Sequence, residues 1–297
     1  MKRHLKTILG FVILIATLAV FAHYLQGHPE IIRQLKSTEP RLLAVLLVAY
    51  AVWWGALAWV LQINLRMFRK KMPAQENILL SAYSSLLNFF GPGQSGPGLR
   101  AVYLKKRHNM RVKDYIFATL LYYACYAVIS ATFLFIGTRP WWQTAGLIVA
   151  AGAASTIVLR WYMKRSNIGG GEGLNVVTMG WLFVATAVQL LAQFVIYFIE
   201  ISSINTHVGV GQALAYTGAA NFSLFVALTP GAIGIRESFL LFSQGLHHIG
   251  SSTIVAANVI DRAIYLVFLG LLFVLVLSMH AGKKLKWRQT VQDAEKE

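Results

Sequence analysis

The sequence predicts an all-α integral membrane protein with about six spanning helices and two re-entrant helical hairpins, arranged as an inverted-topology repeat. Hydrophobic residues make up 57% of the chain and charged residues 13%, with a mean hydropathy of +0.57. A soluble domain carries roughly 25% charged residues, so this composition favours a membrane protein. Two Pro-Gly-interrupted apolar segments, Asn88–Arg100 and Leu228–Glu237, occupy matching places in the two halves, which is typical of proteins built from inverted repeats.

Six apolar runs approach or exceed the ~18 residues that indicate a membrane-spanning helix. They are Ile8–Leu25, Leu42–Ile63, Tyr115–Gly137, Trp141–Trp161, Val176–Ile201 and Ile254–Met279. The first run is longer than the core of a secretory signal, so we expect it to remain as the first helix. We expect a single polytopic membrane domain over residues 1–297.

The two interrupted segments share a pattern of residues as well as a position. Pro92 and Pro230 lie 138 positions apart, each is followed by glycine, and each has a second glycine four residues later. A further match, Ala118–Tyr126 with Ala257–Tyr265, has an offset of 139. These matches predict two repeat halves, residues 1–139 and 140–282, followed by a cytoplasmic tail, 283–297.

The distribution of basic residues predicts the topology. With the N-terminus inside, 20 of the 27 Lys and Arg residues fall on the inner side, 4 fall on the outer side and three fall within the membrane. Both ends of the first interrupted segment are basic, so we interpret it as a hairpin that enters and leaves on the inner side. The second then enters from outside, which gives the halves opposite orientations. The alternative is that each hairpin is a kinked helix that crosses the membrane.

Five charged side chains fall within the predicted membrane region. They are Arg100, Arg236, Glu237, Asp261 and Arg262. Placing a charged side chain at the centre of a bilayer costs at least ~2.5–3.5 kcal/mol of insertion free energy, so we expect each of these residues to have a structural or functional role. One interpretation is a structural network in which the acids pair with arginines and hold the second hairpin against the last span. The other is a site for an anionic headgroup, because the five groups sum to +1 and Arg100 has no acidic partner in its own half.

Glycines at the two breaks are candidates for backbone contact with the same ligand. They are Gly93, Gly96 and Gly98 in the first segment and Gly231 and Gly234 in the second. We expect one helix to start after Gly98 and another after Gly231 or Gly234. Such starts leave about four N–H groups free and suit a phosphate. The alternative is that glycine and proline only break the helix.

Several other classes of function are disfavoured. Gly91–Gly96 fits G-x-G-x-x-G, but Pro92 lies within it and no strand precedes it, so we expect no nucleotide cofactor. Metal ligands with suitable spacing are not apparent, so no metal site is predicted. The net charge of +16 comes from short clusters at helix ends, which argues against a nucleic-acid partner.

The motif Pro230–Glu237 followed by Asn258–Arg262 resembles the transmembrane region of the bacterial lysylphosphatidylglycerol synthase/flippase, the multiple peptide resistance factor family. The resemblance runs from the second span to the last. It implies a flippase-like fold in the bacterial cytoplasmic membrane that moves charged phospholipid between leaflets. With the topology above, both termini are expected in the cytoplasm.

The chain departs from the family pattern in three places. Gly96-Pro97 stands where the family usually has Gly-Glu, and Tyr122-Tyr123 stands where an acidic residue and an arginine are expected. The soluble aminoacyl-transferase domain is not present in this sequence. Lysyl transfer is therefore not expected, and the first two departures leave open whether the first loop binds as the second does.

The leading hypothesis is a translocase for an anionic phospholipid or a lipid-linked phosphate, with no cofactor and no enzymatic activity of its own. Arg100, Arg236 and Arg262 would hold the phosphate, while Glu237 and Asp261 orient the arginines or carry a coupling proton. Two alternatives remain open at this stage. One is a non-catalytic partner of an envelope-lipid enzyme, and the other is an intramembrane lipid-phosphate transferase that uses a carboxylate as its base.

Overall fold

The computed structural model describes residues 26, 29, 39–90, 95–136, 141–166, 175–226, 232 and 235–294, and the ordered elements within these ranges are all helical. Four of the helices are long and apolar enough to cross a membrane. They are α3 (Pro40–Arg66), α6 (Val112–Phe135), α8 (Val176–Ile204) and α12 (Ser251–Ala294, apolar over Ser251–Met279). The all-α membrane class is confirmed, as are four of the six predicted spans.

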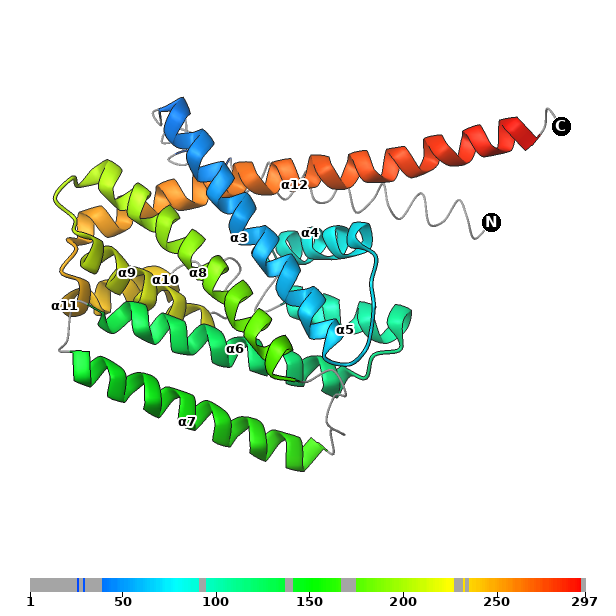
Figure 1. Ribbon diagram of the computed structural model, residues 1–297. Helices are drawn as coiled ribbons and strands as arrows, with labels where there is room; N and C mark the ends of the chain where they lie inside the picture. The colour runs from blue at the N-terminus through cyan, green and yellow to red at the C-terminus, as the bar shows by residue number, and fades with distance from the viewer. Residues whose placement is uncertain are drawn as a thin grey trace.

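The other two predicted spans have different outcomes. The fourth forms a helix, α7 (Trp141–Ser166), but α7 does not qualify as a long apolar span in the part of it that is described. The first, Ile8–Leu25, lies outside the described residues. Figure 1 shows α7 at the edge of the molecule, next to α6, and the end of α12 extending beyond the other helices.

Local sequence explains where several helices begin and end. Pro40 occupies the first turn of α3, where its missing N–H costs nothing. Asn175 caps α8, because its side-chain oxygen accepts a hydrogen bond from the Thr178 amide at 2.8 Å. Arg66 lies in the last turn of α3, where a positive charge is favourable.

Each interrupted segment is a set of shorter helices. The first consists of α4 (Ala74–Phe90) and α5 (Ser95–His108), which pack against each other. The second consists of α9 (Val210–Ser223), the 3₁₀ turn η1 (Leu224–Val226), α10 (Ile235–Phe242) and α11 (Gln244–His247). In Figure 1 the first set lies at one side of the crossing helices α3 and α8, and the second set lies at the other.

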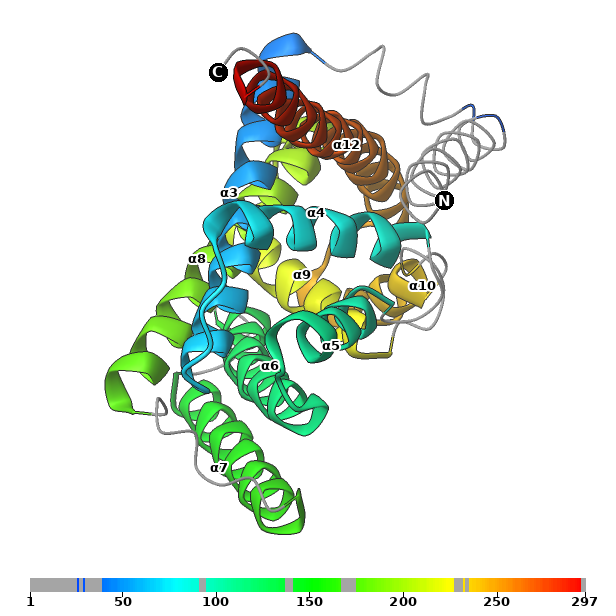
Figure 2. The same ribbon diagram turned by 90° about the vertical axis from the view of Figure 1, so that its right-hand side faces the viewer.

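The helix packing couples the two ends of the chain. Helix α3 packs along α8, and α12 packs against both of them. Helix α4 from the first half contacts α12, while α9 from the second half contacts α6. In Figure 2, α4 and α5 run side by side and face α10.

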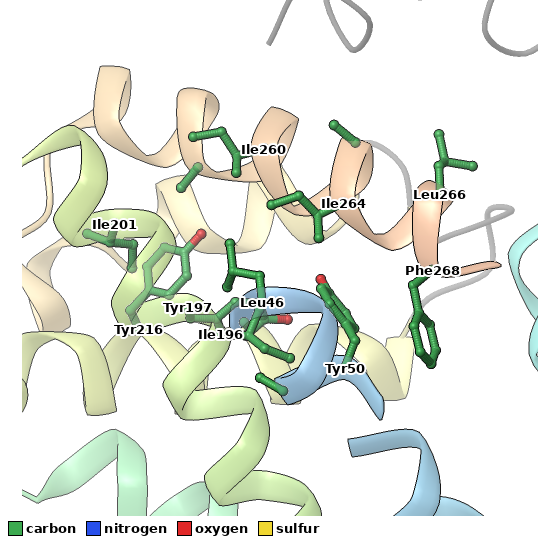
Figure 3. Packing of buried hydrophobic residues seen from close by; sticks show 14 of the residues in the cluster. Leu46, Tyr50, Ile196, Tyr197, Ile201, Tyr216, Ile260, Ile264, Leu266 and Phe268 are labelled. Carbon is green, nitrogen blue, oxygen red and sulfur yellow. The ribbon is translucent and has the colours of Figure 1, made fainter. Parts of the chain in front are cut away.

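A large apolar cluster lies where α3, α8 and α12 meet. Leu46 and Ile264 are fully buried there, and Ile196 is 1% exposed. Figure 3 shows Tyr50 and Tyr197 among these aliphatic side chains, with their hydroxyl groups inside the cluster. Polar groups in an apolar interior need hydrogen-bond partners, and Tyr50 finds one on Asp261.

The outward faces of the bundle carry large apolar side chains. Phe242 is 89% exposed, Val176 is 88% exposed and Val149 is 71% exposed. A soluble protein rarely presents apolar surface on this scale, whereas lipid is a good solvent for it. This surface agrees with the four apolar helices, and the chain is a multi-pass integral membrane protein.

Candidate functional site

A cavity of about 280 Å³ lies between the two interrupted segments. Its wall includes Asn88, which precedes the first Pro-Gly break, and Gly96 and Pro97, which follow it. Phe225, before the second break, and Ala232, within the second interrupted segment, also line the cavity. Helices from both halves of the chain complete the wall. Both breaks therefore border one shared cavity.

Four charged residues of the second half form two ion pairs that join α10 to α12. Arg236 Nη1 donates to Asp261 Oδ2 at 2.6 Å, and Tyr50 donates to the other oxygen of the same carboxylate. One residue further along each helix, Arg262 Nη2 donates to Glu237 Oε1. The structural network anticipated from the sequence therefore exists. Both acids are engaged with arginines.

The ion pair does not use all the donors of Arg236. Its Nε and Nη2 atoms are buried and have no hydrogen-bond partner within the described ranges. The guanidinium also lies over the Tyr197 ring, 4.9 Å from the ring centroid. A buried charged donor without a partner is costly, so this end of Arg236 is suited to an anion that enters the cavity.

Arg100 is the cavity's cation from the first half. It is 8% exposed, and its Nε donates to Ser84 Oγ at 2.9 Å. The same hydroxyl donates to the Gly96 carbonyl oxygen at 2.9 Å, which ties α4 to the start of α5. Among the described residues Arg100 forms no ion pair, whereas Arg236 and Arg262 each have a carboxylate.

The predicted glycines have different positions. Gly96 lines the cavity, and a Cβ atom there would lie 2.7 Å from the Ser84 carbonyl oxygen, so only glycine allows the approach of α4 to α5. Gly98 is exposed on α5, and a Cβ atom there would meet nothing within 4 Å. Gly93, Gly231 and Gly234 lie outside the described residues.

One predicted helix start is correct and the other is wrong. Helix α10 begins at Ile235, directly after Gly234, and this start places Arg236 in its first turn. Helix α5 begins at Ser95 and not after Gly98. The difference arises because Pro97 and the two flanking glycines fit the first turn, where proline is tolerated and N–H groups are unpaired in any case.

The first-half counterparts of Asp261 and Arg262 also line the cavity. At the offset of 139 these are Tyr122 and Tyr123, which carry no charge. Tyr122 donates to Gln189 Oε1 at 3.0 Å. Gln189 in turn lies 139 positions after Tyr50, so the Tyr50–Asp261 and Gln189–Tyr122 contacts join equivalent positions.

Several cavity residues were not predicted from the sequence. Gln189, Gln193 and Tyr197 lie on one face of α8 and line the cavity, as does Asn221 of α9. Glu200, on the same face, is 1% exposed, and its Oε1 has no partner in the described part of the chain. The available signal was the i, i+4 spacing of polar residues within an apolar run, which indicates an inward-facing stripe.

The described site contains the elements of an anion receptor. No group of three or more potential metal ligands occurs among the described residues. The cavity wall has a formal charge of +2, from Arg100, Arg236, Arg262 and Asp261. Seven tyrosines and five amide side chains also line it. It offers charged donors, neutral hydrogen-bonding groups and aromatic faces within one space.

Comparison with known proteins identifies one family. A family model described as the lysylphosphatidylglycerol synthase TM region matches residues 7–272, which is most of the chain. The match includes both interrupted segments and every charged residue of the cavity. No curated protein matches the chain.

Proposed function

Because the chain belongs to the family of the lysylphosphatidylglycerol synthase TM region, we propose that it moves an anionic phospholipid, or a lipid-linked phosphate, between the leaflets of a membrane. The headgroup occupies the shared cavity while the acyl chains stay in lipid. The match is to the membrane region of that family, and the proposed role is transport through this region.

The observation that carries the proposal is the unpartnered side of Arg236. Two of its donor atoms, Nε and Nη2, are buried at the cavity without a protein acceptor in the described ranges. A phosphate oxygen is the acceptor that a guanidinium binds best, through two parallel hydrogen bonds. Asp261 holds the other side of the guanidinium and fixes its orientation, and Tyr50 in turn donates to the Asp261 carboxylate.

Arg100 supplies a second cation from the opposite half of the chain. Without a carboxylate partner in the described structure, its charge is balanced only when an anion enters. Arg236 also lies in the first turn of α10, where the helix dipole favours negative charge. Arg262 lines the same cavity, with its charge paired to that of Glu237.

We further propose that the two halves form an inverted repeat with two re-entrant hairpins. Shifted by 138 or 139 positions, α3 corresponds to α8, α4 to α9, α5 to α10 and α6 to α12. The contacts correspond too, since α4 packs on α12 as α9 packs on α6, and α5 packs on α6 as α10 packs on α12. Repeats of this kind place a site at their interface and give alternating access when one half moves against the other.

The membrane potential determines the direction in which transport of an anionic lipid is energetically favourable. An interior-negative potential favours outward movement of one negative charge by about 2.3 kcal/mol per 100 mV. Export of an anionic lipid therefore needs no nucleotide. We propose the bacterial cytoplasmic membrane as its location, as the family resemblance implies, with both termini inside, as the distribution of basic residues favours.

The test uses Arg236→Lys in vesicles that contain the purified protein and a fluorescent anionic phospholipid. Lysine keeps the charge that Asp261 needs but loses the forked donors, so the protein folds and lipid movement falls by at least about tenfold. Arg66→Ala, at an exposed position on α3, is the control for a changed arginine and retains the wild-type rate.

Two results would reject the proposal. The first is lipid movement no faster than in protein-free vesicles for the folded wild-type protein. The second is an unchanged rate in Arg236→Lys. Recovery of the lipid in a chemically altered form would instead favour an intramembrane transferase.

A further inference from the structure

The cavity contains unpartnered polar atoms besides those of Arg236. Trp53 Nε1, Asn64 Oδ1, Ser85 Oγ and Asn221 Nδ2 are all buried without a hydrogen-bond partner in the described part of the chain. All four residues line the cavity. Native proteins leave few such atoms, so a cluster around one cavity indicates that a ligand supplies the partners.

We infer that the headgroup accepted by this cavity is an uncharged polyol linked to phosphate, as in a glycerol or inositol phospholipid, and not a bare phosphate or an amine-bearing head. The inference rests on the proposed transport function and specifies its substrate class. It assigns the phosphate to the arginines and the hydroxyl groups to the neutral polar atoms.

The donor and acceptor inventory separates a polyol from a phosphate. Trp53 Nε1 and Asn221 Nδ2 need acceptors, Asn64 Oδ1 needs a donor, and Ser85 Oγ takes either role. An ionised phosphate only accepts, so it leaves the amide oxygen unsatisfied. Each hydroxyl of a polyol both donates and accepts, and a polyol therefore matches the mixed set.

The charge of the cavity separates a polyol from an amine. Asp261 is the single acidic residue among the described residues of the wall, and it is already bound to Arg236 and Tyr50. In the first half, tyrosines stand at the positions of the charged pair. Because Arg236 is paired with Asp261 and Arg262 with Glu237, Arg100 supplies the uncompensated positive charge of the described wall. An ammonium group would be repelled by that charge and would find no free carboxylate in the wall.

A chain of contacts places the two kinds of group next to each other. The Arg236 guanidinium lies over the Tyr197 ring, and Gln193 Nε2 donates to the Tyr197 hydroxyl at 2.9 Å. Tyr126 lies 3.5 Å from Gln193 Oε1 and donates to Asn221 Oδ1 at 3.0 Å. The polar wall thus runs without interruption from the phosphate-binding arginine to the neutral amide.

The size of the cavity agrees with a headgroup as the occupant. At about 280 Å³ it lies just below the ~300–1,000 Å³ of typical small-molecule sites. The aromatic wall, which includes Tyr122, Tyr126 and Tyr265, packs against the C–H faces of a polyol, while the hydroxyls of Tyr122 and Tyr126 keep their hydrogen bonds to Gln189 and Asn221.

The experiment compares acyl-labelled lipids that differ only in the headgroup, in vesicles with the same purified protein. The probes are phosphatidylglycerol and phosphatidylinositol as polyols, phosphatidic acid as the bare phosphate, and lysyl-phosphatidylglycerol as the amine. Each polar atom that gains a hydrogen bond increases the affinity for the headgroup roughly two- to tenfold. We therefore expect both polyol lipids to move several times faster than phosphatidic acid and the lysyl ester.

Ser85→Ala tests the assignment of the hydroxyl groups. The Ser85 Oγ atom has no protein partner in the described structure, so its removal leaves the fold intact. We expect the ratio of the phosphatidylglycerol rate to the phosphatidic acid rate to fall roughly two- to tenfold. Ser278→Ala, at an exposed position on α12, is the matched control and keeps the wild-type ratio.

The outcomes distinguish this inference from the proposed function. Equal rates for polyols and phosphatidic acid, or a faster lysyl ester, overturn the inference while transport itself stands. An unchanged ratio in Ser85→Ala also overturns it. Absence of movement for every probe rejects the transport function, and the inference with it.

Discussion

At the scale of single residues, Arg236 divides its donors: Nη1 binds Asp261, while Nε and Nη2 have no partner in the described part of the chain. Arg236, Asp261 and Arg262 were singled out because charge within an apolar segment is costly, and all three line the cavity. Sequence alone could not show that Arg236 uses one nitrogen for Asp261 and keeps two unpartnered, because that depends on side-chain geometry. Glu200 lies near the end of the predicted span Val176–Ile201, and its burial, at 1% exposed, was not predicted from the sequence.

The Glu237–Arg262 pair provides a prediction at this scale. Arg262→Ala leaves the Glu237 carboxylate in a mostly buried position without that partner, so we expect about 1–3 kcal/mol of destabilisation. Exchanging the two residues, as Glu237→Arg with Arg262→Glu, restores the attraction and most of the stability. Thermal unfolding in detergent measures both. If the exchanged protein is no more stable than Arg262→Ala, the ion pair does not hold α10 to α12.

At the scale of elements, the helix ranges were largely predictable and the hairpin geometry was not. The predicted span Val176–Ile201 became α8, Val176–Ile204, because the apolar run and the Asn175 cap define it. The start of α5 was misplaced by four residues, because the conformation of Gly96-Pro97-Gly98 depends on the packing of α4 against α5. Close packing between two helices of this kind is difficult to predict from the amino-acid sequence.

Gly96 and Gly98 form a matched pair for testing the packing of the first hairpin. In Gly96→Ala the new Cβ atom lies 2.7 Å from a backbone oxygen of α4, so we expect roughly 1–3 kcal/mol of destabilisation. In Gly98→Ala the methyl group meets no neighbour, and stability stays constant or rises by up to about 1 kcal/mol. Equal melting temperatures for the two variants would contradict the close contact of α4 with α5.

The base of the same hairpin predicts a dependence on pH. Burial tends to raise the pKa of Glu76, but hydrogen bonds from Tyr103 at 2.6 Å and His108 at 2.8 Å, with the charge of Arg107 nearby, lower it overall. A lowered carboxyl pKa stabilises the folded state above the ordinary glutamate value of about 4.3, and this is lost as the pH falls through the folded pKa.

We therefore expect the melting temperature to fall more steeply below about pH 4.3 in the wild type than in Glu76→Gln, which lacks this carboxyl group. Glu39→Gln, at an exposed position before α3, is the control and keeps the wild-type slope. The measurement is thermal unfolding in detergent between pH 6 and pH 3.5. Identical slopes for wild type and Glu76→Gln would show that the carboxylate does not hold α4 to α5.

At the scale of the whole molecule, the all-α membrane class followed directly from composition and from the length of the apolar runs. The orientation of the halves stays a prediction, supported by the basic residues and by the matching contacts of α4 with α12 and α9 with α6. The shared cavity follows from this arrangement, because it depends on which helices of opposite halves meet. The sequence offset of 139 gave the correspondence between residues but not their positions in space.

The topology is testable with single cysteines in a Cys125→Ser background, since the chain has one native cysteine. In cells, a thiol reagent that cannot cross the membrane should label His207→Cys and Gly250→Cys at the two ends of the second hairpin. Lys71→Cys and Lys106→Cys, at the ends of the first hairpin, should react only after the cells are opened. Labelling of just one residue of either pair before opening would mean that the segment crosses the membrane.

The most direct measurement of the central claim is an experimental structure of the protein in a bilayer disc that contains an anionic phospholipid. The account predicts a lipid phosphate within hydrogen-bonding distance of Arg236 Nε and Nη2, with its acyl chains outside the cavity, and loss of that lipid in Arg236→Lys. An acyl chain in the cavity, with every phosphate held at the membrane surface, would contradict it.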